Sequence, residues 1–359
     1  MIAILPILAV IFSLAILISL ARPIFLPAES SDARKISIII PARNEEANLE
    51  VLLTSLKQQD TGPLEIIVID DQSDDNTAAV ARKHGAVVVS GKELPDGWKG
   101  KTWACQQGAD AATGDWLLFL DADLKLLPGS LGKLAALTTT KAVHSLCPYH
   151  RVHQGYEQLS AYFNAITLAG VDAFAATPSQ QATLFGQVLL IHRDHYRDAG
   201  GHEAVRKEIL ENYQLAKRLE QNEVEIRHYL GKDAVEMRMF PEGIRQLIQS
   251  WKKGFLAGAT QAPARALITT SLWLTGGMVL TGCLLTVFLF PPFFIKLTLA
   301  ASLLYAVISF FPFRLAGNFS PFAILFFPIP LLFYQGLFFI SLLDQKRGRS
   351  QTWKGRSID

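Results

Sequence analysis

Short apolar runs, most of them β-branched, alternate with segments of helical periodicity between Lys35 and Asp121, and this alternation is the strongest constraint on the fold. Strands are predicted over residues 35–40, 64–70, 86–89 and 116–121, and helices over 45–59, 76–85 and 101–112. A regular alternation of strand and helix predicts an α/β domain whose parallel sheet is covered by helices on both faces. In such sheets, ligands bind outside the carboxyl ends of the strands.

Acidic clusters follow three of these predicted strands. The chain reads ARNEE after the first strand, DDQSDDNT after the second and DAD after the fourth. Carboxylates at such close range repel one another unless a cation or a proton lies among them. Mg²⁺ or Mn²⁺ takes one or two carboxylates together with substrate phosphates, so Asp121 and Asp123 are candidate metal ligands. The alternative for this pair is a solvated turn before Pro128.

Apolar segments flank this charged middle on both sides. Residues 2–20 carry no charge, and further apolar segments are predicted over 267–290, 294–311 and 320–343. Segments of this length are typical of helices that cross a bilayer. The predicted organisation is a membrane anchor at 1–24, a soluble domain at 35–262, membrane helices at 263–343 and a basic tail at 344–359.

Basic residues predict which side of the membrane these parts occupy. Arg22, Arg34 and Lys35 follow the first apolar segment, and the tail is rich in lysine and arginine. By the positive-inside rule, the soluble domain and the tail of this multi-pass cell-membrane protein both lie in the cytoplasm. That arrangement needs an even number of crossings, so one of the three later segments is re-entrant or interfacial. Pro328 and Pro330 single out the last segment, and the number of spans stays open.

Charge and cysteine content argue against two classes of protein. The net charge of +2 does not indicate a nucleic-acid partner, and the basic residues form no stripe through the soluble part. The three cysteines, Cys105, Cys147 and Cys283, have neither zinc-site spacing nor the even count of a disulfide framework.

Four motifs in one order, PARNEE, DDQSDDNT, GKTWACQQG and FLDAD, resemble those of the inverting glycosyltransferases of family 2. The resemblance covers about residues 35–255 and implies a GT-A fold, a UDP-sugar donor and dependence on Mg²⁺ or Mn²⁺. It implies that Asp121 and Asp123 bind the metal, which acts as a Lewis acid on the leaving nucleoside diphosphate. The donor-binding residues that it implies are Pro41, Ala42, Arg43, Asn44, Glu45, Asp71, Lys101 and Asp121.

The general base of that family is the aspartate of an E-D-x-x-L-x-x-R segment, and this chain has Asn212 at the aspartate position. An amide takes up no proton at neutral pH, so Glu211 becomes the candidate base, with Glu208 as the second choice. The alternative for Glu211 is a first-turn charge that interacts with the helix dipole. An acceptor carboxylate would weaken the need for a base, because it is already ionised at pH 7.

Two segments are implied to bind the acceptor. The segment AGGHE supplies Gly201, His202 and Glu203. The segment SWKKG supplies Trp251 for the acceptor and Lys252, or the lysine after it, for the diphosphate. An amphipathic helix at the membrane interface is the alternative for the second segment. Family members that synthesise polymers carry a Q-x-x-R-W motif in this segment, whereas this chain reads QSWKK at 249–253. The difference favours transfer of a single sugar over polymer synthesis.

A narrower resemblance rests on LPDGWKGKTWACQQG, on FPEG followed by SWKKG, and on WKGR at 353–356. These segments resemble the family members of bacterial carotenoid pathways that glycosylate a carotenoid carboxylic acid. The implied reaction moves glucose from UDP-glucose to this lipid acceptor. Relatives that act on a polyprenyl phosphate, a hopanoid or diacylglycerol share some features, so these acceptors remain alternatives. A non-catalytic membrane protein that binds nucleotide sugar is the alternative of another class, prompted by Asn212.

Overall fold

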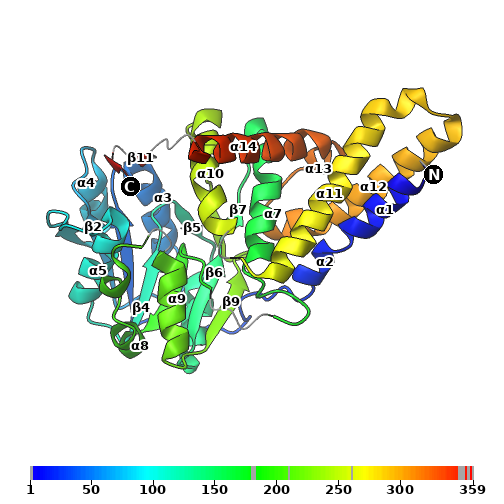
Figure 1. Cartoon of the computed structure of the whole chain (residues 1–359). Coiled ribbons are helices and arrows are strands. Elements are labelled where there is room, and N and C mark those ends of the chain that lie inside the picture. Colours follow the sequence, from blue (N-terminus) through cyan, green and yellow to red (C-terminus); the bar gives the residue numbers. More distant parts are fainter. Residues whose placement is uncertain are drawn as a thin grey trace. The chain divides into compact units, whose positions relative to one another are not determined.

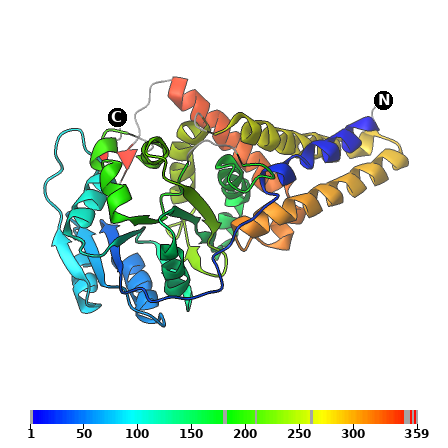
Figure 2. The same ribbon diagram turned by 90° about the horizontal axis from the view of Figure 1, so that it is seen from below.

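The computed structural model describes residues 3–178, 183–208, 211–259, 262–346, 352–353 and 356–357. The chain divides into two compact units. The sheet unit comprises Ile24–Tyr149 and Ala182–Arg238, and the helical unit comprises Met1–Pro23, His150–Gln181 and Met239–Asp359. The elements of both units are drawn in two views (Figures 1 and 2).

A seven-stranded sheet organises the sheet unit, in the order β3-β2-β1-β4-β8-β6-β9. β1 pairs in parallel with both of its neighbours, in a register that places Ile38 beside Ile66 and Leu118. All four strands predicted from the sequence are present, and each agrees with its predicted bounds to within two residues. The strands of this sheet are β1 (Ile36–Ala42), β2 (Glu65–Asp70), β3 (Val87–Ser90), β4 (Trp116–Leu120), β6 (Val143–Cys147), β8 (Val188–His192) and β9 (Ile226–Leu230).

The prediction of a purely parallel sheet is wrong, because β8 runs antiparallel to both β4 and β6. β6 and β9 are parallel to each other. The alternation of strand and helix, which is the sequence signal for parallel pairing, ends at β4. The chain reaches β8 only after residues 150–181, which belong to the helical unit. The α/β class is confirmed, with a mixed sheet.

The predicted helices of the sheet unit are present as α3 (Glu46–Lys57), α4 (Thr77–Lys83) and α5 (Gly100–Ala111). α5 packs closely on β1, because a Cβ at Gly108 would lie only 2.3 Å from Ile39 Cγ2. α9 (Glu211–Gln221) joins α5 in one buried cluster with the central strands. This packing fixes the first turns of α5 and α9 relative to the sheet. The cluster includes Ile39, Ile67, Ile69, Ala104, Cys105, Phe119, Leu189, Ile191, Leu215 and Leu219.

The helical unit is built around long apolar helices. α1 (Ile4–Ser13) packs along α11 (Ala264–Thr286) and α12 (Pro292–Ala316), as Figure 1 shows in blue, yellow and orange. Gly276 permits this contact, because a Cβ there would lie 2.4 Å from the carbonyl oxygen of Ala9. The other helices of this unit are α2 (Ile16–Ser19), α7 (Ala161–Gly170), α10 (Ile244–Ala259), α13 (Pro321–Leu325) and α14 (Pro328–Lys346).

Two segments of the helical unit, Ala264–Leu289 and Pro292–Ala316, are long and apolar enough to cross a membrane. The apolar helices at Ile4–Ser19 and Pro328–Asp344 are shorter. The segment predicted over 320–343 is divided into α13 and α14 near its prolines. Large apolar side chains of this unit face outward, with Phe288 89% exposed and Phe322 75% exposed.

Shorter elements complete the described part of the chain. They are β5 (Leu124–Leu126), α6 (Ser130–Ala136), η1 (Leu137–Thr139), β7 (Tyr149–His150), η2 (Gly155–Ser160), α8 (Arg193–Asp198), η3 (Glu203–Val205), β10 (Val235–Met237), η4 (Val287–Leu289), β11 (Thr352–Trp353) and β12 (Arg356–Ser357). Most of the basic tail predicted at 344–359 lies outside the described residues.

Candidate active site

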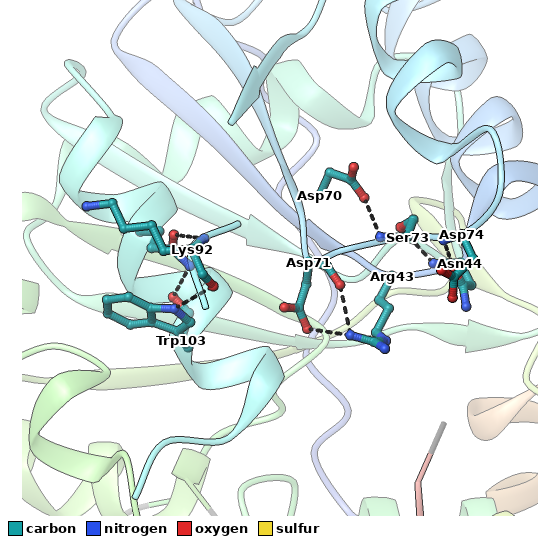
Figure 3. Close-up of polar contacts among 9 residues, drawn as sticks. Arg43, Asn44, Asp70, Asp71, Ser73, Asp74, Lys92 and Trp103 are labelled. Atoms are coloured by element: carbon teal, nitrogen blue, oxygen red, sulfur yellow. Dashed lines mark hydrogen bonds and ion pairs between the residues drawn. The ribbon is translucent and has the colours of Figure 1, made fainter. Parts of the chain in front are cut away.

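The loops that follow β1 and β2 are joined by hydrogen bonds at the carboxyl end of the sheet (Figure 3). Arg43 Nη1 donates to the carbonyl oxygen of Asp71 at 3.0 Å and lies 3.9 Å from its Oδ2. The backbone N–H of Asn44 donates to Ser73 Oγ, and Asn44 Oδ1 accepts from the N–H of Asp74. These contacts hold the predicted donor-binding segments against each other.

Part of the acidic cluster after β2 is engaged in local hydrogen bonds. Asp70 Oδ1 accepts from the N–H of Ser73 at 3.2 Å. Asp75 accepts from the N–H groups of Glu46 and Thr77, at the starts of α3 and α4. These two carboxylates are thus stabilised by neutral N–H donors, and the prediction of a cation applies to the aspartates at the end of β4.

A small cleft lies at the carboxyl ends of β1 and β4, within the sheet unit. It brings together five of the predicted site residues, from both the donor-binding and the acceptor-binding groups, with Asn212 beside them. The cleft is lined by Pro41, Lys101, Thr102, Cys105, Phe119, Leu120, Asp121, Gly186, Leu189, His202, Glu211 and Asn212.

An ion pair joins the first turn of α5 to the end of β4 in this cleft. Lys101 Nζ lies 2.5 Å from Asp121 Oδ1. Burial alone would lower the pKa of Lys101, but the carboxylates of Asp121 and Glu211 outweigh it and raise that pKa. The lysine therefore stays charged throughout the physiological pH range.

Asp123 is half-buried near Asp121, and its surroundings disfavour the ionised form of its carboxyl group. Loss of hydration raises the pKa of Asp123 to about 7, and the negative charges of Asp121 and Glu45 add to the shift. Such a carboxylate gains a great deal from a nearby cation.

The two aspartates fit a hard divalent ion that is shared with a substrate. Among the described residues, no group of three or more His, Cys, Asp or Glu side chains is arranged to hold a metal ion by itself. Mg²⁺ and Mn²⁺ sites that also bind phosphates need only one or two carboxylates from the protein. The carboxylate oxygens of Asp121 and Asp123 are such a donor set.

Glu211 begins α9, and its carboxylate is oriented by the next residue. Asn212 Nδ2 donates to Glu211 Oε1 at 3.2 Å. Burial raises the pKa of Glu211, while the positive charge of Lys101 opposes the shift. Glu208, the second candidate base, is exposed. A carboxylate with a raised pKa that faces a cleft is suited to accept a proton near neutral pH.

Gly186 leaves the space that the Asn212 side chain occupies, because a Cβ at Gly186 would lie 2.0 Å from Asn212 Nδ2. We expect Gly186→Ala to displace Asn212, at a stability cost of about 1–3 kcal/mol. Displacement of the neighbouring Glu211 by about 1 Å would lower turnover by up to about 10²-fold. Activity and thermal unfolding are measured together. The matched control is Gly62→Ala in the same unit, where a Cβ meets nothing within 4 Å. Equal activity in the two variants would contradict the role of Gly186.

A hydrogen-bonded network positions His202 at the cleft. Its Nδ1 lies 2.8 Å from Tyr196 Oη, which also accepts from the His202 backbone N–H. Gln106 Oε1 accepts from Tyr196 Oη and from the N–H of Glu203. Burial lowers the pKa of His202 to about 3, and the charge of Lys101 contributes. His202 is therefore neutral at physiological pH.

The predicted residues on either side of His202 play different parts. Gly201 has φ +56°, and a Cβ there would lie 2.9 Å from Gln106 Oε1, so the turn requires glycine. The side chain of Glu203 is exposed and lies 3.9 Å from Arg206 Nη1.

Comparison with known proteins identifies the family. The family model described as Glycosyl transferase family 2 matches residues 37–165. The 4,4'-diaponeurosporenoate glycosyltransferase of Staphylococcus aureus strain USA300 is 32% identical over 330 residues, which are 90% of this chain and 88% of that protein. The protein of the same name from strain MRSA252 is also 32% identical over 330 residues. The chain belongs to glycosyltransferase family 2.

The fold of this glycosyltransferase agrees with that assignment. The mannosyltransferase PcManGT from Pyrobaculum calidifontis, solved in complex with GDP-Man and Mn²⁺, superimposes with a TM-score of 0.51 at 17% identity. The superposition covers 88% of this chain and 99% of that one. The GT-A fold predicted from the sequence is confirmed.

Thr102, Cys105 and Gly186 line the cleft of this glycosyltransferase without having been predicted, and further residues that the sequence did not assign lie in and around α5. Lys99 immediately precedes α5, and it interacts electrostatically with Glu211 and Glu208. Gln107 Oε1 accepts from the N–H of Lys92. Trp103 Nε1 donates to the Lys92 carbonyl oxygen (Figure 3). Lys99, Trp103 and Gln107 all belong to the GWKGKTWACQQG segment, which carries the family resemblance, but the resemblance implied no role for these three side chains.

Trp251 and Lys252 lie on α10 in the helical unit. The Trp251 ring stacks on Phe163 at 4.5 Å between centroids, and its Nε1 donates to Ser160 Oγ at 3.2 Å. Lys252 Nζ forms an ion pair with Asp344 of α14. The side chain of the next lysine lies outside the described part of the chain. The acceptor and diphosphate roles of Trp251 and Lys252 stay predictions.

Proposed function

We propose that this membrane-bound, inverting glycosyltransferase moves one glucose from UDP-glucose to the carboxylate of a carotenoid acid of the 4,4'-diaponeurosporenoate type. The observation that carries the proposal is the 32% identity over 330 residues to the enzyme of that name. An alignment of this length extends beyond the sheet unit into the helical unit, which contains the long apolar helices.

The donor binds at the carboxyl end of the sheet. Segment 41–45 and Asp71 hold the uridine. The hydrogen bonds that join the loops after β1 and β2 support this proposal, because they keep the two segments together. Asp121 and Asp123 hold Mg²⁺ or Mn²⁺, and a solved protein of the same fold carries Mn²⁺ with a nucleotide sugar. The bound ion offsets the negative charge that develops on the leaving diphosphate. Lys101 places an ammonium group in the same cleft for that diphosphate.

The acceptor carboxyl group meets Glu211 and His202 in this proposal. A carboxylic acid at the end of an apolar chain, held in an apolar setting, has a raised pKa and is partly protonated. Glu211 takes that proton, and Asn212 keeps its carboxylate oriented. His202 remains neutral and offers a ring nitrogen as a hydrogen-bonding group. Trp251 contacts the apolar part of the acceptor.

The membrane arrangement that we propose uses two crossings after the catalytic domain. α11 and α12 are the spans, and the apolar segment at Ile4–Ser19 is the anchor. α14 lies at the membrane–water interface beside α10. The ion pair between Lys252 of α10 and Asp344 of α14 joins the two helices. Two crossings place the domain at 35–262 and the tail at 344–359 on the same, cytoplasmic side.

The pH dependence of kcat/KM is expected to show an acidic limb well above the ordinary glutamate pKa. Asp123, with a pKa of about 7, and Glu211, with a raised pKa, must both lose a proton before transfer occurs. Activity therefore falls as the pH drops through these values. Metal binding competes with the proton on Asp123, so more Mn²⁺ moves that limb to lower pH, while the Glu211 limb does not move. A limb near the ordinary glutamate pKa at every Mn²⁺ concentration would rule out both assignments.

The substrate assignment is tested with membranes that contain the wild-type protein. They are incubated with labelled UDP-glucose, UDP-galactose or GDP-mannose and with total lipid extract from a bacterium that makes carotenoid acids. We expect label from UDP-glucose in the carotenoid fraction. Label in a polyprenyl phosphate, hopanoid or diacylglycerol fraction instead would retain the glycosyltransferase and reject the carotenoid acceptor.

A further inference from the structure

An ion pair in the cleft joins two residues to which separate roles are proposed. Lys101 Nζ is 2.5 Å from Asp121 Oδ1, yet Lys101 is assigned to the diphosphate and Asp121 to the metal. Both side chains are about one-quarter to one-third exposed, so solvent can reach the pair. The Asp121 N–H donates to the Gln187 carbonyl oxygen at 3.0 Å, which fixes the backbone of the aspartate. The lysine, with its flexible four-carbon stem, is the partner that can move.

The surroundings of this pair contain more negative than positive charge. Asp123 and Glu211 both interact electrostatically with Lys101 and with Asp121. A buried or half-buried group of carboxylates is unfavourable without a counter-ion. In the ligand-free protein, Lys101 supplies that counter-ion at Asp121.

We propose that Lys101 occupies the cation position at Asp121 until metal and nucleotide arrive together, and that it then transfers from Asp121 to the donor diphosphate. This inference rests on the proposed metal and diphosphate roles of the cleft. An ammonium group within 3 Å of a carboxylate oxygen repels a divalent ion that approaches the same oxygen. Metal binding therefore requires the lysine to leave.

The nucleotide makes that exchange favourable. A diphosphate gives the displaced ammonium group a new anionic partner, so the cost of leaving Asp121 is offset only when nucleotide is bound. Each ligand then strengthens the binding of the other by the same factor, because the coupling between two sites is reciprocal. Lys101 is thus a positioning residue that makes metal and donor bind as a pair.

The test measures Mn²⁺ affinity of the full-length protein in detergent, with and without UDP, from the electron paramagnetic resonance signal of free Mn²⁺. We expect UDP to tighten Mn²⁺ binding by the wild-type protein by about 5- to 150-fold. Lys101→Gln should bind Mn²⁺ alone more tightly than the wild type does, and should lose most of the UDP effect. Lys101→Met, which is also uncharged, should behave like Lys101→Gln.

Two control variants separate this effect from a general change in charge. Lys101→Arg keeps the positive charge and should retain the UDP effect. Lys57→Gln removes an exposed lysine at the end of α3 and should match the wild type. In EDTA, Lys101→Gln should unfold at a lower temperature than the wild type, because its cleft carboxylates lack a counter-ion, and Mn²⁺ should reverse the difference.

The possible failures are distinguishable. If wild-type protein binds Mn²⁺ with UDP, but both uncharged variants bind Mn²⁺ alone no more tightly than it does, the Lys101 inference is wrong and the metal site stands. If wild-type protein binds no Mn²⁺ even with UDP, the proposed metal site fails and the inference fails with it. Unfolding scans in Mn²⁺ identify any variant that has not folded.

Discussion

Asp121→Asn is expected to lower kcat by about 10²- to 10³-fold, because it removes a metal ligand at the position where charge develops on the leaving group. The amide is a poor ligand for a hard cation that also needs charge compensation. The same substitution removes the carboxylate that lies 2.5 Å from Lys101 Nζ. Transfer of label from UDP-glucose and binding of UDP are measured on the same preparation.

The matched control is Asp115→Asn, at the opposite end of the same strand. Asp115 is exposed and precedes β4, while Asp121 follows it. The control should keep wild-type turnover, and wild-type protein in EDTA should fall to the level of Asp121→Asn. Turnover of Asp121→Asn within tenfold of the wild type would reject this residue as a metal ligand.

Glu211→Gln is expected to lower turnover by up to about 10²- to 10⁴-fold at pH values where the acceptor acid is protonated, the usual contribution of a general base, and by less as the ionised fraction of the acid grows. Glutamine has nearly the same shape, so UDP-glucose binding should change little. Equal losses in turnover and in donor binding would move Glu211 to the donor site. Glu220→Gln, an exposed position near the other end of α9, is the matched control.

The loss in Glu211→Gln should also depend on pH in a way that identifies the acceptor. A carboxylic acid acceptor ionises without help as the pH rises, so the variant should recover toward wild-type turnover at high pH. An alcohol acceptor does not ionise in this range, and the variant would remain impaired at every pH. Recovery is therefore specific to a carboxylate acceptor.

The sequence predicted the local elements of the sheet unit well because each of them is a short-range pattern. The β-branched runs of β1 and β2 and the apolar run of β4 are largely buried, and continuous apolar runs of this length are typical of strands in a covered sheet. Residues that follow such strands meet at one edge of the sheet. This rule predicts that Pro41 and Asp121 lie close together, and both line the cleft.

The missed features depend on contacts between segments far apart in the chain. β8 lies between β4 and β6 in the sheet, although many residues separate it from both strands in the sequence. The periodicity of hydrophobic residues within one segment therefore could not predict its antiparallel direction or the contact between Gly186 and Asn212. The Lys101–Asp121 ion pair follows from the approach of α5 to β4, which no motif spacing encodes. Gln106 belongs to the GWKGKTWACQQG segment, but its two hydrogen bonds to segment 196–203 join residues far apart in the sequence and could not be predicted from it.

The most direct test is transfer by purified wild-type protein in detergent from labelled UDP-glucose to a synthetic C30 carotenoid acid, with the corresponding carotenoid alcohol as the matched acceptor. Products are separated by chromatography with and without EDTA and after mild base, which cleaves a glycosyl ester. The account predicts a base-labile product on the acid, lost with EDTA and absent or much weaker with the alcohol. Label on the alcohol or on another lipid, with none on the acid, would contradict it.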